Sequence, residues 1–359
     1  MPSPKSKRYL LKILPFGIIP CLFAVVYSLL EQGILGDHPV YPSTGNVYTF
    51  NVLIPTLISF ILGLFIGMFE VGFLSKVFIK SGFAKKISIK TLIYFFIIFA
   101  AITIISTIST AFYFNASPFS TVVWDDVQNF LSSFALWSIM LYFTMGVVTC
   151  LFYSEIANNV GQNVLLNFFM GKYHHPKEEE RVFLFLDMKS STTIAEQLGH
   201  TTYFQLLRDY YSDLSDAIIR FGGEIYQYVG DEVVVTWRLK PNEKNSESID
   251  CFFAMQQALA SKSAKYSRKY GVVPTFKAGI HLGKVTTGEI GKIKKDIVFT
   301  GDVLNTTARI QGLCNAYKVQ LLLSQELVEA LDLITTHKAY ELGQTELRGR
   351  DEKITLYSI

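Results

Sequence analysis

The segment FLFLDMKSSTTIAE, at residues 183–196, determines the fold of the C-terminal half of the chain. The apolar run over residues 182–188 contains Asp187 near its end, which predicts a buried β-strand with a carboxylate at its carboxyl end. Four polar residues follow and lead into a helical pattern: Lys189, Ser190, Ser191 and Thr192. A turn from a strand into a helix offers free backbone N–H groups, which suit phosphate oxygens. We therefore expect a phosphate-binding turn directly after this strand.

The segment YQYVGDEVVVTW, at residues 226–237, predicts a hairpin. Two strand-like runs, Glu224–Tyr228 and Glu232–Trp237, are joined by a tight turn through Gly230 and Asp231. The turn places a second carboxylate at the hairpin tip. Mg²⁺ is held by one or two carboxylates plus substrate phosphates, so the two aspartates together are a suitable pair of metal ligands. Taken alone, Asp231 is better explained as an ordinary turn residue.

Two further segments follow in order: GIHLGKVTTGEIG at 279–291 and FTGDVLNTTARIQ at 299–311. In the second, Asn305 and Arg309 lie four residues apart on a helix that we expect to be capped near Asp302, so they share a face. An arginine on that face can neutralise charge that develops on a phosphate during reaction.

The four segments, in this order and at these spacings, resemble the class III adenylyl/guanylyl cyclase catalytic domain over roughly residues 180–359. The resemblance covers about half of the chain. It implies an α+β, ferredoxin-like catalytic domain that converts a nucleoside triphosphate into a cyclic nucleotide. It also decides between the two explanations of Asp231 in favour of a metal ligand.

The resemblance implies a role for each polar position. Asp187 and Asp231 are expected to bind two divalent cations, Mg²⁺ or Mn²⁺, with help from the Met188 carbonyl. Asn305 and Arg309 are expected to act near the transition state. In the implied reaction, the ribose 3′ hydroxyl attacks the α-phosphorus and expels pyrophosphate.

Three positions depart from the family pattern. Arg348 stands where the family commonly has a phosphate-binding lysine, and arginine also binds phosphate, with a different geometry. Gln227 lies four residues before the second metal aspartate, where adenylyl members usually have Lys and guanylyl members Glu. Its partner position is Val298, which cannot hydrogen-bond, although Asp296 lies on the same strand face. The Gln amide suits either purine edge. We expect ATP as substrate because adenylyl cyclases are the commoner bacterial type, and keep GTP as the alternative.

The active site of this family forms between two catalytic domains, one of which supplies the aspartates and the other the asparagine and arginine. This chain carries one such domain, so the resemblance implies a homodimer with its active sites at the dimer interface. The formal net charge of +3 gives no reason to expect a nucleic acid partner. The four cysteines form no CxxC motif, which argues against a zinc site or a disulfide framework.

The N-terminal half has the composition of a membrane protein, since 50% of the chain is hydrophobic. A spanning helix needs about 20 apolar residues. Four stretches meet this requirement: Leu10–Leu30, Thr49–Leu74, Thr91–Phe114 and Phe130–Tyr153. The first is too long for a signal-peptide core and ends without a clear cleavage site, so we interpret it as a span. Glu70, near the end of the second, is expected to be an interfacial residue.

The basic residues indicate how these spans are oriented in the lipid bilayer. They occur before the first span and between the second and third spans, whereas the other two loops contain no Lys or Arg. The positive-inside rule therefore predicts a multi-pass protein of the inner (cytoplasmic) membrane with cytoplasmic N- and C-termini.

A connector joins the two halves. From Ser154 to Tyr173, apolar residues recur at three- and four-residue steps, which predicts a helix with one apolar face. Pairing with a second copy and packing on its own domain or on the membrane both suit such a face. The segment KYHHPKEEER at 172–181 is typical of a linker. We expect a four-helix transmembrane domain at 1–153, the connector helix and linker at 154–180 and the catalytic domain at 181–359.

Other classes of protein share parts of this pattern. A diguanylate cyclase would explain Gly230–Glu232, but it has no place for the helix with Asn305 and Arg309. A membrane receptor whose cyclase-like domain only binds nucleotide would explain the unusual Gln227 and Val298. A transporter would need more polar residues within the spans.

Overall fold

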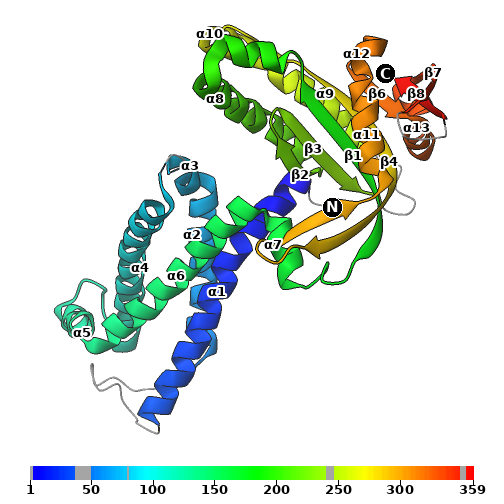
Figure 1. Ribbon diagram of the computed structural model, residues 1–359. Coiled ribbons are helices and arrows are strands. Elements are labelled where there is room, and N and C mark those ends of the chain that lie inside the picture. The colour runs from blue at the N-terminus through cyan, green and yellow to red at the C-terminus, as the bar shows by residue number, and fades with distance from the viewer. Residues whose placement is uncertain (1–2, 37–49, 79–80, 240–245, 348–352) are drawn as a thin grey trace. The chain divides into compact units, whose positions relative to one another are not determined.

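The computed structural model describes residues 3–36, 50–78, 81–239, 246–347 and 353–359. Most of these residues belong to two compact units, Ser6–Leu166 and Asn167–Ile359 (Figure 1). The first unit consists of helices, whereas the second contains a β-sheet covered by helices. This confirms the predicted fold class, a multi-span helical membrane domain followed by an α+β cyclase-type domain.

The helical unit contains long helices joined by short segments. In chain order these are α1 (Pro4–Leu35), α2 (Leu53–Phe69), the π-helix η1 (Glu70–Leu74), α3 (Ser75–Val77), α4 (Phe83–Phe114), α5 (Thr121–Leu131) and α6 (Phe134–Val160).

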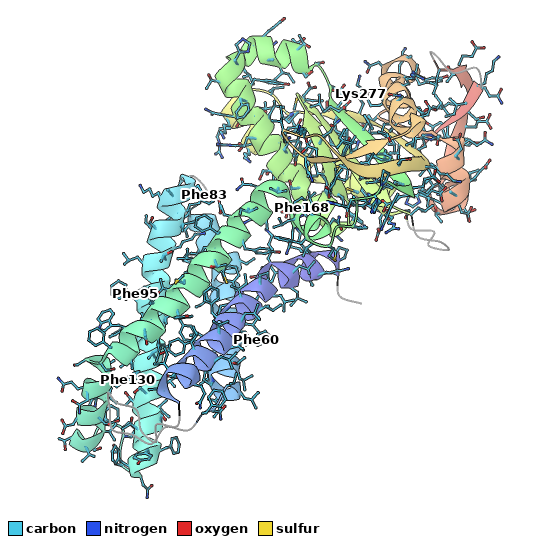
Figure 2. All side chains as sticks on the ribbon, turned by 60° about the horizontal axis from the view of Figure 1, so that its bottom comes forward. Phe60, Phe83, Phe95, Phe130, Phe168 and Lys277 are labelled. Carbon is cyan, nitrogen blue, oxygen red and sulfur yellow. The ribbon has the colours of Figure 1, made fainter. Side chains whose placement is uncertain are left out.

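Among the described residues, four helical stretches are long and apolar enough to cross a membrane: Pro4–Leu35, Leu53–Val77, Phe83–Phe114 and Phe134–Val160. They overlap the four predicted spans, although the fourth begins at Phe134 rather than at Phe130, and Thr49 of the second lies outside the described residues. Their surfaces carry exposed apolar side chains such as Phe65 and Phe96, and many further side chains of this kind stand along the helices (Figure 2). Such surfaces are unfavourable in water but suit lipid chains. The chain is therefore a membrane protein.

Glu70 is buried among the helices, which the sequence did not indicate, and its predicted position at the membrane surface stays a prediction. Only 2% of Glu70 is exposed, its carboxylate is ion-paired with Lys90, and it accepts a hydrogen bond from the Tyr94 hydroxyl at 2.8 Å. Both partners come from α4, which hydropathy along the chain did not place beside η1. A buried charge is tolerated where it is paired in this way.

The connector is not one continuous helix, contrary to the prediction. Gly161 adopts a φ of +98° and ends α6, and α7 (Gln162–Phe169) begins after it. A positive φ is incompatible with a right-handed helix and costs glycine little. Strand β1 (Lys177–Met188) then begins within the segment expected to be a linker, because Lys177–Arg181 already pairs with β4.

The second unit alternates strands and helices. After β1 come α8 (Ser191–Arg220), β2 (Glu224–Val229), β3 (Glu232–Arg238), α9 (Glu247–Ser261), α10 (Ser263–Tyr270), β4 (Phe276–Ile290), β5 (Asp296–Thr300), α11 (Asp302–Gly312), α12 (Cys314–Tyr317), β6 (Leu321–Ser324), α13 (Gln325–Leu331), α14 (Leu333–His337), β7 (Tyr340–Glu346) and β8 (Lys353–Ser358). The strand order is β2-β3-β1-β4-β6-β8-β7, and β5 pairs with β4.

Strand β1 lies between β3 and β4, antiparallel to both, and is buried on both faces. Its side chains alternate: Leu184 and Leu186 pack with α8 and α9, whereas Phe183 and Phe185 pack on the face that carries α11. This explains why the strand is a continuous apolar run. Asp187 has the same parity as Phe185 and therefore lies on the α11 face.

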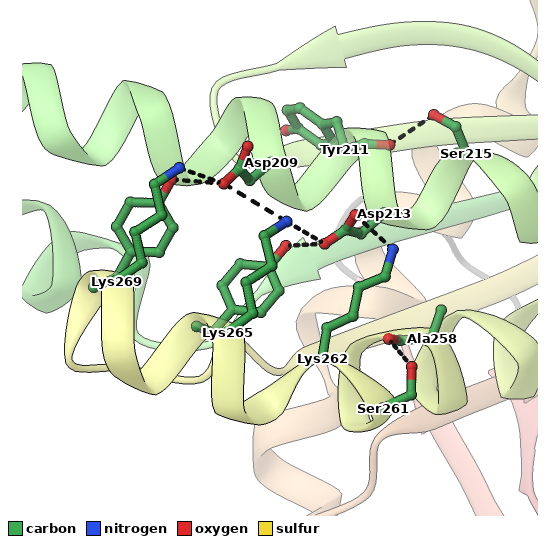
Figure 3. A network of polar contacts seen from close by, with 11 residues as sticks. Asp209, Tyr211, Asp213, Ser215, Ala258, Ser261, Lys262, Lys265 and Lys269 are labelled. Carbon is green, nitrogen blue, oxygen red and sulfur yellow. Dashed lines mark hydrogen bonds and ion pairs between the residues drawn. The ribbon is translucent and has the colours of Figure 1, made fainter.

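A polar network joins α8 to the region of α9 and α10 (Figure 3). Asp213 accepts hydrogen bonds from Lys262 at 2.7 Å, from the buried Tyr266 hydroxyl at 2.9 Å and from Lys265 at 3.2 Å. One turn earlier, Asp209 accepts from Lys269 at 2.7 Å. These contacts fix the helices that cover the sheet opposite Asp187.

Candidate active site

The two aspartates that the sequence singled out meet at one end of the sheet. Asp187 lies opposite Glu232 of β3, and Asp231 directly precedes Glu232 in the turn between β2 and β3. Strands that pair in this register bring a residue near the end of one strand to the start of its neighbour. The predicted hairpin, with its turn at Gly230 and Asp231, is present as expected.

The electrostatics around these carboxylates favour a cation. Burial raises the pKa of Asp187, and the hydrogen bond and charge of Asp231 raise it further. Lys277 opposes this shift, with its Nζ 3.4 Å from Asp187 Oδ2. Among the described residues, Asp231 Oδ2 is buried and has no hydrogen-bond partner. An unsatisfied buried carboxylate oxygen beside a second carboxylate fits a divalent cation.

The donor set matches a cation that shares its ligands with a substrate. Within the part of the chain that the structure describes, no three His, Cys, Asp or Glu side chains are grouped as a complete metal cage. Mg²⁺ usually keeps several waters and takes phosphate oxygens in addition to one or two carboxylates. The pair of aspartates is sufficient for that arrangement.

Two contacts of Asp187 were missed by sequence reasoning. Gln311 Nε2 donates to Asp187 Oδ2 at 3.2 Å, and Lys277 lies directly opposite Asp187 on β4. Gly279 allows α11 to approach, because a Cβ there would lie 2.5 Å from the Gln311 backbone nitrogen. Gly279 is the first glycine of GIHLG, so the sequence contained this signal. Only the packing of α11 against β4 reveals which helix the glycine allows to approach.

The turn after β1 exposes a helix N-terminus. Met188 is buried at the end of the strand, the Lys189 N–H donates to the Thr275 carbonyl at 2.8 Å, and Ser190 adopts a left-handed φ of 56°. Helix α8 starts at Ser191. The N–H groups at the start of its first turn, including that of Thr192, have no acceptor within the helix. The N–H groups and the helix dipole favour an anion here.

Asn305 and Arg309 lie on α11, but the structure does not bring them to the aspartates of the same chain. Gln311 points to Asp187, and Arg309 lies two residues earlier on the same helix. The two side chains are therefore separated by roughly 160° around the helix axis, so Arg309 faces away from Asp187. Asn305 is exposed. Within the described part of the chain, Arg309 Nη1 is buried without a hydrogen-bond partner.

The candidate base-recognition residues lie on β2 and β5. Gln227 is exposed on β2 beside an irregularity in its pairing with β3. Val298 is half-buried on β5, and Asp296 is exposed and ion-paired with Lys294 at 2.9 Å. Arg348 lies outside the described residues.

The strands that carry Gln227 and Val298 are in contact through the neighbouring residues. The rings of Tyr226 and Phe299 have centroids 4.9 Å apart. The two strands are therefore close enough to serve one ligand.

The chain belongs to the adenylate and guanylate cyclase catalytic domain family, whose model matches residues 174–359. It is similar to adenylate cyclase 2 of Rhizobium meliloti, with 34% identity over 209 residues, 58% of this chain and 58% of that protein. It is also similar to an adenylate cyclase of Anabaena cylindrica, with 27% identity over 183 residues, 49% of this chain and 36% of that protein.

Among solved structures, a bacterial light-regulated adenylyl cyclase shares the fold. Its TM-score is 0.53 at 18% sequence identity, over 64% of this chain and 66% of that chain. The matches span less than two thirds of the length of the curated relatives, 58% and 36% of those proteins.

Proposed function

We propose that this protein is a membrane-bound adenylate cyclase that converts ATP into 3′,5′-cyclic AMP and pyrophosphate for intracellular signalling. The observation that carries the proposal is the proximity of Asp187 to Asp231, whose Oδ2 is buried and has no hydrogen-bond partner among the described residues. The named relatives of R. meliloti and A. cylindrica support ATP as the substrate.

Asp187 and Asp231 would hold two divalent cations, Mg²⁺ or Mn²⁺, with the Met188 carbonyl nearby. When bound, such cations supply charge stabilisation to the phosphates and lower the pKa of a coordinated hydroxyl. The cyclase family generally uses divalent metals. Lys277 balances part of the carboxylate charge and would contact a phosphate once the carboxylates are otherwise occupied.

The N-terminus of α8 would bind the triphosphate through the backbone of Ser190, Ser191 and Thr192, with Lys189 and Arg348 as phosphate-binding cations. The 3′ oxygen of ribose forms a bond to the α-phosphorus, and the bond to the bridging oxygen breaks, so pyrophosphate leaves. The hydroxyl proton passes to solvent or to a phosphate oxygen of the substrate.

Two copies of the chain would form each active site. Arg309 and Asn305 are directed away from the aspartates of their own chain, so they would act on the substrate held by the partner. Arg309 would stabilise the charge that develops on the α-phosphate. The homodimer then has two equivalent sites at its interface.

Gln227 would recognise the base, with Val298 beside it and Asp296 as a further acceptor.

The membrane helices would hold the protein in the inner membrane with both termini in the cytoplasm, where ATP is present. The catalytic domain at 181–359, the connector at 154–180 and the membrane domain at 1–153 would be the working parts.

The test is turnover by the full-length protein in detergent, with ATP and GTP offered separately and Mg²⁺ or Mn²⁺ present. We expect cyclic AMP from wild type and none from Asp231→Ala. Asp216→Asn, which removes an exposed carboxylate on α8, is the matched control and should retain activity. Production of cyclic GMP alone would show that GTP is the substrate. Nucleotide binding without any cyclic product would contradict the proposed enzymatic activity.

A further inference from the structure

A cavity of 140 Å³ lies within the helical unit, lined by residues of α1, α2 and α6. Its size is close to that of an engineered apolar cavity of about 150 Å³ that binds benzene. The cavity therefore has room for one small ring or a short apolar chain. None of the proposed catalytic residues lines it.

The walls of the cavity are largely aromatic. The Tyr142 ring on α6 lies edge-on to Tyr27 of α1, with ring centroids 5.1 Å apart, and edge-on to Phe23 at 6.4 Å. The Tyr27 hydroxyl is 2.8 Å from Ser138 Oγ, so its polar end already has a partner. This contact holds the ring in place and leaves its apolar body available to a ligand.

Among the described residues, Glu31 is the one charged residue that lines this cavity. Its side chain is half-buried, and among the residues that the structure describes it has no hydrogen-bond or ion-pair partner. Two other acids of the helical unit are paired: Glu70 with Lys90 and Glu155 with Lys86. A carboxylate that is partly withdrawn from water is stabilised by a cation beside it.

We propose that this cavity binds a small organic ammonium compound with an apolar body about the size of one ring. The ammonium group would pair with the Glu31 carboxylate, and the body would lie against Tyr27 and Tyr142. Aromatic rings attract cations through their electron-rich faces, which adds to the charge interaction. An anionic ligand would be repelled by Glu31.

The proposal is tested by isothermal titration calorimetry on the full-length protein in detergent. The probes are 2-phenylethylamine and the neutral 2-phenylethanol, which have similar size and shape. We expect saturable binding of the amine, at least about tenfold tighter than that of the alcohol, because a hydrogen bond to a charged group is the stronger kind. Equal affinities, or no binding of the amine, would refute the proposal.

Glu31→Gln keeps the shape and removes the charge, so amine affinity should fall to that of the alcohol. Asp125→Asn removes an exposed acid on α5 and should leave it unchanged. Ala24→Leu reduces the cavity volume and should weaken both probes. Unaltered amine binding in Glu31→Gln would overturn the assignment. Binding is measured without turnover, so the result is independent of the proposed cyclase activity.

Discussion

The hydroxyl of Tyr211 lies 2.9 Å from the carbonyl oxygen of Gly230 and 3.2 Å from that of Glu232. These two carbonyls flank Asp231, so α8 holds the turn that carries this carboxylate. Burial raises the pKa of Tyr211, and the charge of Asp231 raises it further, so the hydroxyl stays protonated and able to donate.

Tyr211→Phe should weaken metal binding without unfolding the domain. The loss of a shared hydrogen bond costs about 1 kcal/mol, which corresponds to roughly a fivefold higher Mn²⁺ concentration for half-maximal cyclase activity. The measurement is cyclic nucleotide production against Mn²⁺ concentration. Tyr340→Phe, at an exposed tyrosine, is the control. An unchanged Mn²⁺ dependence in Tyr211→Phe would show that Tyr211 does not position the turn.

Asp231→Ala and Arg309→Ala should each be inactive, yet they should complement each other when coexpressed. Half of randomly formed dimers are mixed, and each mixed dimer keeps one of its two sites, so roughly a quarter of wild-type activity should return. The measurement is the cyclase activity of the purified mixture. The absence of recovery would mean that Asp231 and Arg309 act within one chain.

Gln227→Glu should move substrate preference from ATP towards GTP. A carboxylate accepts hydrogen bonds, whereas the glutamine amide both donates and accepts. The ratio of kcat/KM for GTP to that for ATP should rise about tenfold, which corresponds to one altered hydrogen bond to the base. If this ratio does not change, base recognition must lie elsewhere on the chain.

Asp213→Asn should lower the stability of the α8 network in a pH-dependent way. Burial alone raises the pKa of Asp213, but hydrogen bonds from Lys262, Tyr266 and Lys265 outweigh it and hold the pKa below its ordinary value. The stabilisation is therefore complete above the unfolded pKa of about 3.9 and is lost as pH falls through the folded pKa.

We expect thermal unfolding of the full chain to give a loss of about 1–2 kcal/mol for Asp213→Asn near pH 7, since Lys262 and Lys265 are partly exposed. The gap between wild type and variant should narrow below about pH 4. A gap that is the same at all pH values would argue against a role for the charge of Asp213. Asp216→Asn again serves as the control.

Lys90→Met should destabilise the helical unit more than the double variant Glu70→Leu with Lys90→Met. The single change leaves Glu70 buried without its cation, which costs about 3–5 kcal/mol, whereas removing both charges is often neutral. Unfolding of the full chain in mixed micelles measures both. Equal losses in the two variants would mean that the ion pair contributes no coupling.

Patterns along the chain were sufficient for much of this protein. The alternation and apolar run before Asp187, the turn at Gly230 and the four apolar stretches each depend on neighbours within a few residues. Helix and strand periodicity is local information, which is why these elements and the spans could be predicted, whereas the fold class of the catalytic domain followed from the family resemblance of the four segments. The break at Gly161 could not be predicted, because a glycine within a helical pattern can adopt either a negative or a positive φ.

Tertiary structure alone decided which distant residues meet. Lys277 reaches Asp187 through the register of β1 with β4, and Gln311 reaches it because α11 packs closely over Gly279. Lys90 meets Glu70 only because α4 packs beside η1. Such pairings depend on how strands align and helices pack, and these contacts join residues far apart in the sequence. Local periodicity does not indicate how strands align or which helices pack together. The sequence by itself therefore determined the helices and strands, and the tertiary structure determined which of them are in contact.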